Sequence, residues 1–299
     1  MEVAKSPLAA RKVIRGLVDG KGELGVVPTM GDLHEGHLSL VRMSLQRCGR
    51  TAVSIFVNPR QFGPGEDLDR YPRNEKRDLE LLGEMGVDLV FMPKPRDIYS
   101  SRDRTRVTVN SVTDYLCGAH RPGHFDGVAL IVAKLFNILS PDIAFFGQKD
   151  AQQAVVIQRM AADLDFPVKI KLGPIVREEN GLAMSSRNRY LNQEQRERAG
   201  SIYGGLRKAK RAVDGGERDS ARVSAIITGA VEKAGMSVEY AEVVDAQRMT
   251  PVKRVEGRVL LAVAAYMDEV RLIDNIALNV GGDRAEEMLL EFPEWSRYE

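Results

Sequence analysis

The stretch VVPTMGDLHEGHLSLV, residues 26–41, joins an apolar run to a helical pattern through a polar turn. The run LGVVPTM (24–30) has the continuous apolar character of a strand that is buried on both faces. Apolar residues recur at helical spacing over residues 37–48. In open α/β sheets, ligands bind beyond the carboxyl ends of the strands, where a helix N-terminus favours an anion. The stretch therefore predicts a strand, an anion-binding turn and a helix of an α/β fold.

The same alternation continues outward along the chain. Further strands are predicted at 51–57, 87–93, 141–147 and 167–176. Further helices are predicted at 74–86, 126–139 and 151–165. Buried strands that alternate with helices are typical of a parallel sheet with right-handed crossovers. We therefore expect residues 1–177 to form a doubly wound parallel α/β domain.

The pattern changes after residue 177. Two charged amphipathic helices are predicted at 192–213 and 219–234, followed by strands within 237–246 and 258–278. These elements indicate a smaller α+β domain over residues 178–299. Its end, residues 284–299, is expected to be an appended helix and tail that extend the domain.

Composition excludes several classes of protein. The 299 residues carry 43 Lys plus Arg against 42 Asp plus Glu, a net charge of +1, so no overall field favours nucleic acid or a membrane surface. The most apolar helical segment, 127–139, is too short to cross a bilayer and contains Lys134. The N-terminus lacks the apolar core of a signal peptide. Cys48 and Cys117 give no disulfide framework, which suits a reducing cytoplasm.

His34 and His37 allow three interpretations: a metal site, structural histidines, or phosphate ligands. Zinc is disfavoured because Gly36 lies between the histidines, no cysteine is near, and the helical zinc-protease motif spaces its histidines four residues apart. Taken alone, the pair would be read as structural. Gly31 and Gly36, with free backbone N–H groups beyond a strand end, favour the third interpretation, in which imidazoles donate to phosphate oxygens. The turn matches neither the GxGxxG nor the GxxxxGK[ST] pattern.

The segment HEGH is similar to the HxGH signature of adenylate-forming nucleotidyl-transfer enzymes. In that superfamily the partner element is a KMSKS-like loop that follows the parallel sheet. Here AMSSRN (183–188) stands where the first domain is expected to end, and its serine hydroxyls and Arg187 would donate to β- and γ-phosphates. MSSR alone is more often a surface turn, so the pairing with HEGH carries this interpretation.

Six separated blocks extend the resemblance to one family. PTMGDLHEGHLSLV, SIFVNPRQFGPGEDLDRYPR, LCGAHRPGHFDGV, KLFNILSPDIAFFGQKDAQQ, PIVREENGLAMSSRNRYL and EYAEVVD together resemble the pantothenate synthetases, or pantoate–β-alanine ligases. The similarity runs in order from about residue 20 to about residue 280. The departures are small. Gln148 stands where Glu or Lys is expected as often as Gln, and the tail beyond residue 280 is expected to be an extension.

The resemblance implies a Rossmann-like first domain, a smaller lid domain and a homodimer. It implies that (R)-pantoate is ligated to β-alanine while ATP, with Mg²⁺, is split to AMP and pyrophosphate through an enzyme-bound pantoyl adenylate, without a tightly bound cofactor. The implied ATP contacts are Met30, Gly31, Asp32, Leu33, His34, Glu35, Gly36, His37, Gly147, Gln148, Lys149, Asp150, Val176, Met184, Ser185, Ser186 and Arg187. Gln61 and Gln153 correspond to pantoate contacts, with Gln61 also near β-alanine, and His37 to the proposed catalytic histidine.

The chemistry requires such groups. Pantoate's carboxylate is ionised at neutral pH and needs no base, so positioning and charge stabilisation carry the first step. We expect His37, His34, Lys149, Ser185 and Ser186 to provide that stabilisation. In the second step the amine of β-alanine must lose protons, and a histidine or ordered water would accept one.

Several assignments stay open on sequence alone. Asp67 and Asp69 are either outer carboxylates of the magnesium site or a plain acidic loop, the second being the simpler reading. Arg121 and His124 either close the site or form a turn. Phe56, Asn58 and Phe62 are expected neighbours of pantoate, and residues 177–187 are a candidate hinge. The alternative functions are a nucleotidyltransferase whose product retains AMP and a non-catalytic nucleotide sensor.

Overall fold

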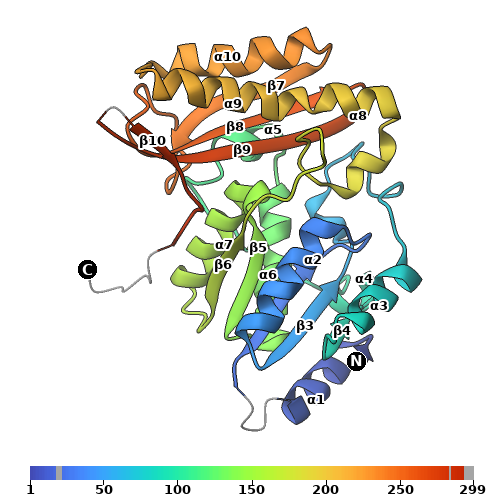
Figure 1. The fold of residues 1–299 in the computed structure, drawn as a ribbon. Helices are drawn as coiled ribbons and strands as arrows, with labels where there is room; N and C mark the ends of the chain where they lie inside the picture. Colours follow the sequence, from blue (N-terminus) through green and yellow to red (C-terminus); the bar gives the residue numbers. More distant parts are fainter. Residues whose placement is uncertain (18–21, 283, 293–299) are drawn as a thin grey trace.

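The computed structural model describes residues 1–17, 22–282 and 284–292 of the chain. They form two sheets with their helices, one above the other in Figure 1, and the later half of the chain supplies the upper sheet. No helix in the described ranges is long and apolar enough to cross a bilayer. Cys48 and Cys117 are both buried as free thiols.

The first sheet is parallel throughout and has six strands in the order β1-β4-β3-β2-β5-β6. Their bounds are β1 Glu2–Ala4, β2 Leu24–Thr29, β3 Arg50–Ile55, β4 Leu89–Phe91, β5 Ile143–Gly147 and β6 Lys169–Gly173. The predicted doubly wound parallel sheet is confirmed. The edge strand β1 and the helix after it, α1 (Pro7–Leu17), were not predicted, because their charged sequence gives no run of apolar residues.

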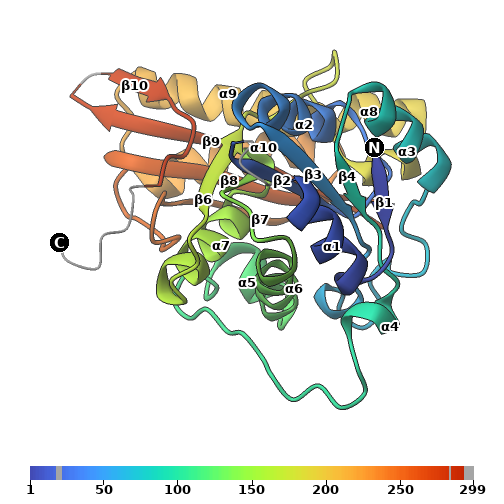
Figure 2. The ribbon, with the colours of Figure 1, turned by 90° about the horizontal axis from the view of Figure 1, so that it is seen from below.

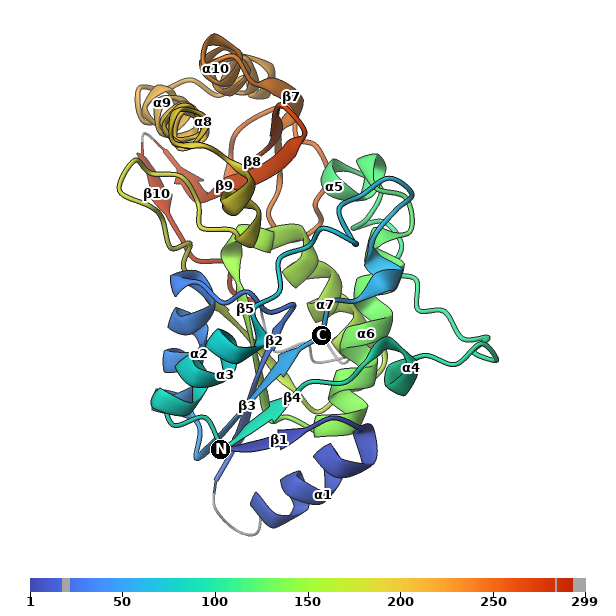
Figure 3. The same ribbon diagram turned by 90° about the vertical axis from the view of Figure 1, so that its right-hand side faces the viewer.

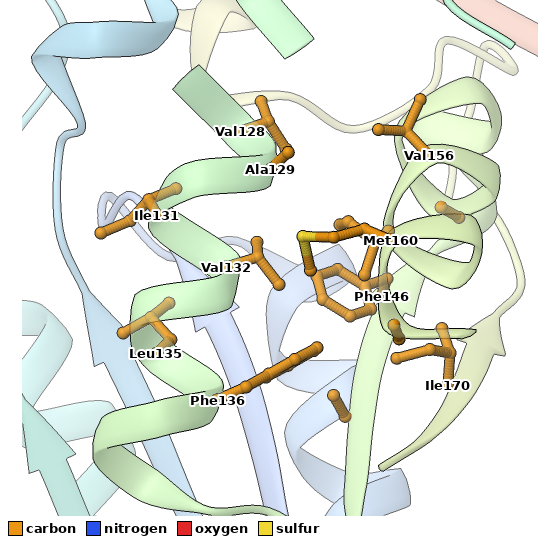
Figure 4. Close-up of a cluster of buried hydrophobic side chains, with 14 of the residues drawn as sticks. Val128, Ala129, Ile131, Val132, Leu135, Phe136, Phe146, Val156, Met160 and Ile170 are labelled. Carbon is orange, nitrogen blue, oxygen red and sulfur yellow. The ribbon is translucent and has the colours of Figure 1, made fainter. Parts of the chain in front are cut away.

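Helices cover both faces of this sheet. Helices α2 (Glu35–Arg47) and α3 (Glu75–Glu84) lie on one face, and α1, α6 (His124–Leu139) and α7 (Ala151–Asp163) lie on the other (Figure 2). Adjacent strand residues point to opposite faces, so Val26 joins the core under α6 and Val27 the core under α2, and both are fully buried. Figure 4 shows side chains of α6 and α7 gathered around Phe146 of β5.

The strand order places a ligand crevice between β2 and β5. The chain leaves β2 toward β3 on one side, whereas β5 pairs with the other side of β2. Connections that diverge from adjacent strands open a crevice at the carboxyl ends of those strands. The remaining short elements of this half are η1 Pro59–Gln61, α4 Pro95–Ile98, α5 Leu116–His120 and η2 Gln148–Asp150.

The second sheet is antiparallel, in the order β10-β9-β8-β7, and α9 and α10 pack on one face of it (Figure 3). The bounds are η3 Ser186–Tyr190, α8 Gln193–Ala199, α9 Ser201–Asp214, α10 Ser220–Lys233, β7 Ser237–Asp245, β8 Gly257–Met267, β9 Val270–Gly281 and β10 Arg284–Glu287. The predicted α+β class is confirmed. The helix expected at 192–213 is two helices that meet at Gly200. The domain boundary near residue 177 stays a prediction.

The prediction of a helix from residue 284 is wrong for the described residues of that segment. Residues 284–287 form β10, which pairs antiparallel with residues 278–281 of β9. These residues favour a helix by only a small free energy, and pairing with the unpaired backbone groups of a sheet edge outweighs that preference. Beyond β10, Leu290 is buried in an apolar cluster that contains residues of both sheets. The predicted tail from residue 293 lies outside the described residues.

Candidate active site

A cavity of about 270 Å³ lies beyond the carboxyl ends of β2 and β5, and residues from both sheets line it. It contains most of the site residues expected from sequence: Met30, His34, Gly36, His37, Gln61, Gly147, Lys149, Asp150, Gln153, Val176, Met184, Ser185, Ser186 and Arg187. Phe56, Asn58, Phe62, Arg121 and His124 line it too. Segments separated by more than 150 residues thus meet at one site.

Five expected residues do not line the cavity. Asp32 and Leu33 are buried in the turn beneath it, and Gly31 and Gln148 are also buried. Glu35 is exposed and pairs with Arg42 on the outside of α2. Asp32 and Gln148 therefore support the lining from behind, whereas Glu35 faces solvent.

Backbone hydrogen bonds fix the tautomers of both histidines. His34 is the N-cap of α2, and its Nδ1 accepts from the N–H of Gly36 at 3.2 Å. The Nδ1 of His37 accepts from the N–H of His34 at 3.3 Å, and the two ring centroids are 4.0 Å apart. A neutral imidazole whose Nδ1 accepts carries its proton on Nε2. Both rings therefore have an Nε2–H group available as a donor.

The surroundings keep both rings uncharged. Burial, followed by the charges of His37, Lys149 and Arg189, lowers the pKa of His34 to about 2. Burial and the charge of Lys149 lower the pKa of His37 to about 4. At neutral pH the pair consists of two neutral donors at the positive end of a helix, which suits an anionic ligand.

Lys149 supplies the cationic group at the end of β5. Burial lowers the pKa of its ammonium, while Asp150 and Asp274 oppose that shift. Its backbone carbonyl accepts from the side chain of Asn275 on β9 at 3.0 Å. The backbone at Lys149, just after β5 of the parallel sheet, is thus held in place by a residue of the antiparallel sheet.

The serine-rich segment is fastened to the histidine turn. The hydroxyl of Ser186 donates to the carbonyl of Asp32 at 3.2 Å. Arg189 lies 2.7 Å from the Asp32 carboxylate, in a contact that lacks hydrogen-bond geometry and so depends on charge. Ser185 caps η3 by accepting from the N–H of Arg187. The two candidate phosphate-binding segments therefore form one unit.

Arg187 is occupied by a carboxylate. Its Nε and Nη2 donate to the two oxygens of Asp67 at 2.8 and 2.7 Å. Burial alone would raise the pKa of Asp67, but the Arg187 guanidinium lowers it overall. Asp67 is therefore committed to an arginine and is a poor candidate for an outer metal carboxylate. In the described part of the chain, no three His, Cys, Asp or Glu side chains gather as a metal site would require.

Sequence reasoning missed the support beneath the histidine turn. The buried carboxylate of Asp78 on α3 accepts from the N–H groups of Asp32 and Leu33 at 2.8 and 2.9 Å. Gly31 and Asp32 both have positive φ, 84° and 50°, so the turn has a backbone that depends on outside support. No local pattern marked Asp78, because its partners lie 45 and 46 residues away.

The fold and site define a nucleotide-binding α/β enzyme with an HxGH-type turn and a serine-arginine segment across the cavity. The sequence matches the profile of the Pantoate-beta-alanine ligase family over residues 2–277, and the chain belongs to that family. It is accordingly a ligase, and the activity of its family is pantothenate formation. The resemblance found in the sequence is confirmed.

Similar proteins and solved structures support the same family assignment. Pantothenate synthetase of Caldicellulosiruptor saccharolyticus is 48% identical over 90% of this chain and 96% of its own length. That of Moorella thermoacetica is 46% identical over 94% of this chain and 99% of its own. A Thermus thermophilus pantothenate synthetase structure matches with a TM-score of 0.87, 40% identity, and coverage of 92% and 98%. A Francisella tularensis ligase complexed with Beta-gamma ATP and Beta-alanine has a TM-score of 0.78, 32% identity, and coverage of 92% and 97%.

Proposed function

We propose that this chain joins (R)-pantoate to β-alanine and splits ATP to AMP and pyrophosphate through a bound pantoyl adenylate. The observation that carries the proposal is the convergence of two Nε2–H imidazoles, the Lys149 side chain and the Ser185–Ser186 segment on one cavity. The Francisella tularensis ligase, complexed with Beta-gamma ATP and Beta-alanine, supports ATP and β-alanine as two of these substrates.

In the first step, an oxygen of the pantoate carboxylate attacks the α-phosphorus of ATP, and the bond to pyrophosphate breaks. The carboxylate has a pKa of about 4, so it attacks without a base. His34 and His37 donate from Nε2 to phosphate oxygens, and Lys149 offsets charge on the leaving pyrophosphate. Neutral imidazoles suit this role because they donate without having to gain a proton.

Arg187 and the serines would complete the phosphate contacts. Ser185 and Ser186 lie beside the histidine turn, and Arg187 presents a planar fork that matches phosphate geometry. Because Asp67 holds that fork, the nucleotide must compete with a carboxylate for it. Gln61 and Gln153 are the amides placed for the hydroxyls of pantoate, with Phe56 and Phe62 as apolar walls.

We expect Mg²⁺ to accompany ATP and to be held by phosphate oxygens, water and one carboxylate. The donor set fits this arrangement, because magnesium commonly takes one or two carboxylates plus substrate phosphates. Asp150 is an exposed carboxylate in the lining and would serve as such a ligand. Bound magnesium would neutralise charge on the phosphates.

In the second step, the amine of β-alanine attacks the acyl carbon, and the bond from that carbon to the AMP oxygen breaks. The histidine turn is poorly suited to accept the amine proton, since Nδ1 of His34 and of His37 already accepts a backbone N–H. We therefore expect water to take it. Of the two proton acceptors that the sequence left open, a histidine and ordered water, we therefore favour water.

A closing motion would protect the adenylate from hydrolysis. We propose a domain boundary near residue 177, with residues 177–187 as the hinge and the second domain as a lid. Small-angle scattering with ATP plus pantoate should then report a smaller radius of gyration than the free protein. The family resemblance further supports a homodimer that works in the cytoplasm, with no nucleic acid or membrane partner.

Exchange of labelled pyrophosphate into ATP tests the function. We expect exchange only when pantoate is present, and AMP release only after β-alanine is added. Exchange without pantoate, or a stable product that retains AMP, would instead support the alternative function, a nucleotidyltransferase whose product keeps the AMP. No turnover with any combination would support a nucleotide sensor.

A further inference from the structure

The backbone carbonyl of Gln61 receives two side-chain hydrogen bonds from the start of α6 and the turn before it. Nδ1 of His124 lies 2.7 Å from this oxygen, and Nη2 of Arg121 donates to it at 3.2 Å. Gln61 ends η1 and lines the cavity. Two side-chain donors from distant positions in the chain thus fix the position of the Gln61 backbone.

The contacts of His124 leave it one tautomer. A carbonyl oxygen only accepts, so Nδ1 carries the proton. Arg121 only donates, so Nε2 of His124 accepts from its Nη1 at 3.1 Å. Burial, followed by the charge of Arg121, lowers the pKa of His124 to about 3. Both ring nitrogens are thus used by protein partners, and the ring is neutral.

Arg121 is itself anchored. Its Nε and Nη2 donate to the two oxygens of Glu66 at 2.8 and 2.5 Å, and both side chains are largely buried, with 12% and 26% exposed. Burial would raise the pKa of Glu66, but hydrogen bonding and charge from Arg121 lower it overall. The carboxylate, guanidinium and imidazole form a chain that ends on the Gln61 carbonyl.

A different set of residues orients the side chain of Gln61. Asn58 donates to its Oε1 at 3.0 Å, and the hydroxyl of Tyr99 donates to Asn58 at 2.8 Å. Within the described residues, the hydrogen-bond partner of Nε2 of Gln61 is the thioether of Met30 at 3.1 Å, which is a weak acceptor. The amide N–H groups therefore remain available for a stronger acceptor, such as an oxygen of a ligand in the cavity.

The backbone around η1 has no room to shift toward α6. A Cβ added at Gly127 would lie 2.1 Å from the carbonyl oxygen of Arg60 and 2.7 Å from the nitrogen of Gln61. Helix α6 thus contacts η1 directly at this glycine. Main-chain packing and the polar chain together specify one placement of Gln61.

We propose that His124 is a positioning residue that, with Arg121 and Glu66, holds Gln61 so that its amide meets pantoate, and that His124 exchanges no proton during the reaction. The inference rests on the proposed function, in which Gln61 contacts pantoate. It resolves the two readings of Arg121 and His124 that the sequence left open: they form a turn whose purpose is to support the site.

Steady-state kinetics of two variants test this role. His124→Phe keeps the ring shape but removes the donor, and His124→Asn keeps an N–H near the position of Nδ1. We expect the Phe variant to raise the KM for pantoate about tenfold, with the KM for ATP changed less than about twofold. The Asn variant should recover most of that loss. The pH profile of kcat should keep its shape in both.

A third variant covers the case in which His124→Phe does not fold. Glu66→Gln releases Arg121 at the far end of the chain and should raise the KM for pantoate several-fold, again without an equal effect on ATP. An unchanged pantoate KM in the Phe variant, or in Glu66→Gln if the Phe variant does not fold, overturns the inference. So does a lost limb of the kcat pH profile, which would make His124 a proton carrier. Equal losses for all substrates, not recovered by Asn, would mean a merely structural role and would also overturn it. Failure of the proposed function is separate, because wild-type enzyme would then lack pantoate-dependent exchange, and the inference would fall with it.

Discussion

The residues HEGH place two imidazoles side by side, and the hydrogen bonds at Nδ1 decide their chemistry. Each Nδ1 is used by a backbone N–H, which leaves each ring one donor, at Nε2. The spacing of the two histidines disfavoured zinc, and their place beside Gly31 and Gly36 beyond a strand end led to the prediction of a phosphate-binding pair. The sequence could not predict the tautomers, because these depend on the direction of backbone N–H groups at the start of α2.

Removing one donor should affect turnover more than folding. We expect His37→Ala to lower kcat by about 100- to 1,000-fold, the usual cost of losing one preorganised donor to a developing charge. Circular dichroism and the melting temperature should stay near wild type. His120→Ala is the matched control, because His120 is exposed and does not itself line the cavity, although its tilted ring lies 5.5 Å from that of the lining residue Tyr240. Near-normal turnover of His37→Ala would refute the role given to His37.

The lowered pKa of His37 predicts a pH dependence of stability. In the unfolded chain this histidine titrates at about 6.5, and in the folded protein at about 4. As the pH falls from 6.5 toward 4, the unfolded state takes up the proton first, so stability present above pH 6.5 is lost. Replacement by Asn should remove about 1.4 kcal/mol per pH unit from the slope of unfolding free energy over that window. Denaturant unfolding at several pH values measures this slope, and identical slopes would contradict the assignment.

At the scale of elements, the histidine turn, for which phosphate binding is proposed, is held by helix α3. The helix itself was predicted from its apolar spacing, but its contact with the turn was not. Asp78 accepts two N–H groups of the turn, and Nη1 of Arg77 donates to the carbonyl of Leu33 at 3.0 Å. The error at β10 has a related cause, since pairing with β9 outweighs a local helical preference. Tertiary contacts of this kind leave no periodic signal in a sequence.

Asp78→Ala should weaken both the fold and ATP binding. Two buried N–H groups would lose their acceptor, at a cost of about 2 to 4 kcal/mol in the free energy of unfolding. The KM for ATP should rise at least several-fold, because the turn that presents His34 would no longer be held. Glu84→Ala, an exposed position of the same helix, should change neither quantity. If Asp78→Ala lost stability but kept the KM for ATP, the turn would not need this support.

At the scale of the whole molecule, the site exists only where the two sheets meet. Asn275 on β9 donates to the carbonyls of Gln148 and Lys149 at 2.9 and 3.0 Å. The N–H of Leu290, beyond β10, donates to the side chain of Gln148 at 2.8 Å. The alternation of strands and helices predicted the parallel sheet and placed the first-domain residues at one sheet edge, and the change of pattern after residue 177 predicted the α+β class of the second domain. Nothing in the sequence pattern predicted which face of the second sheet would contact η2.

Asn275→Ala tests whether the second domain positions Lys149. Loss of two buried hydrogen bonds should lower the free energy of unfolding by about 1 to 3 kcal/mol. We also expect kcat to fall about tenfold as Lys149 loses its fixed place. Asn279→Ala is the control, since Asn279 is exposed on the same strand. A variant with reduced stability but full kcat would show that Lys149 does not need this contact.

Isotope transfer tests the central claim, the activation of pantoate as an adenylate, most directly. Pantoate labelled with ¹⁸O in its carboxylate is converted with unlabelled ATP and β-alanine, and the AMP is analysed by mass spectrometry. The claim predicts one ¹⁸O atom in each AMP, because the attacking carboxylate oxygen stays on phosphorus when the amide forms. AMP without label would contradict it.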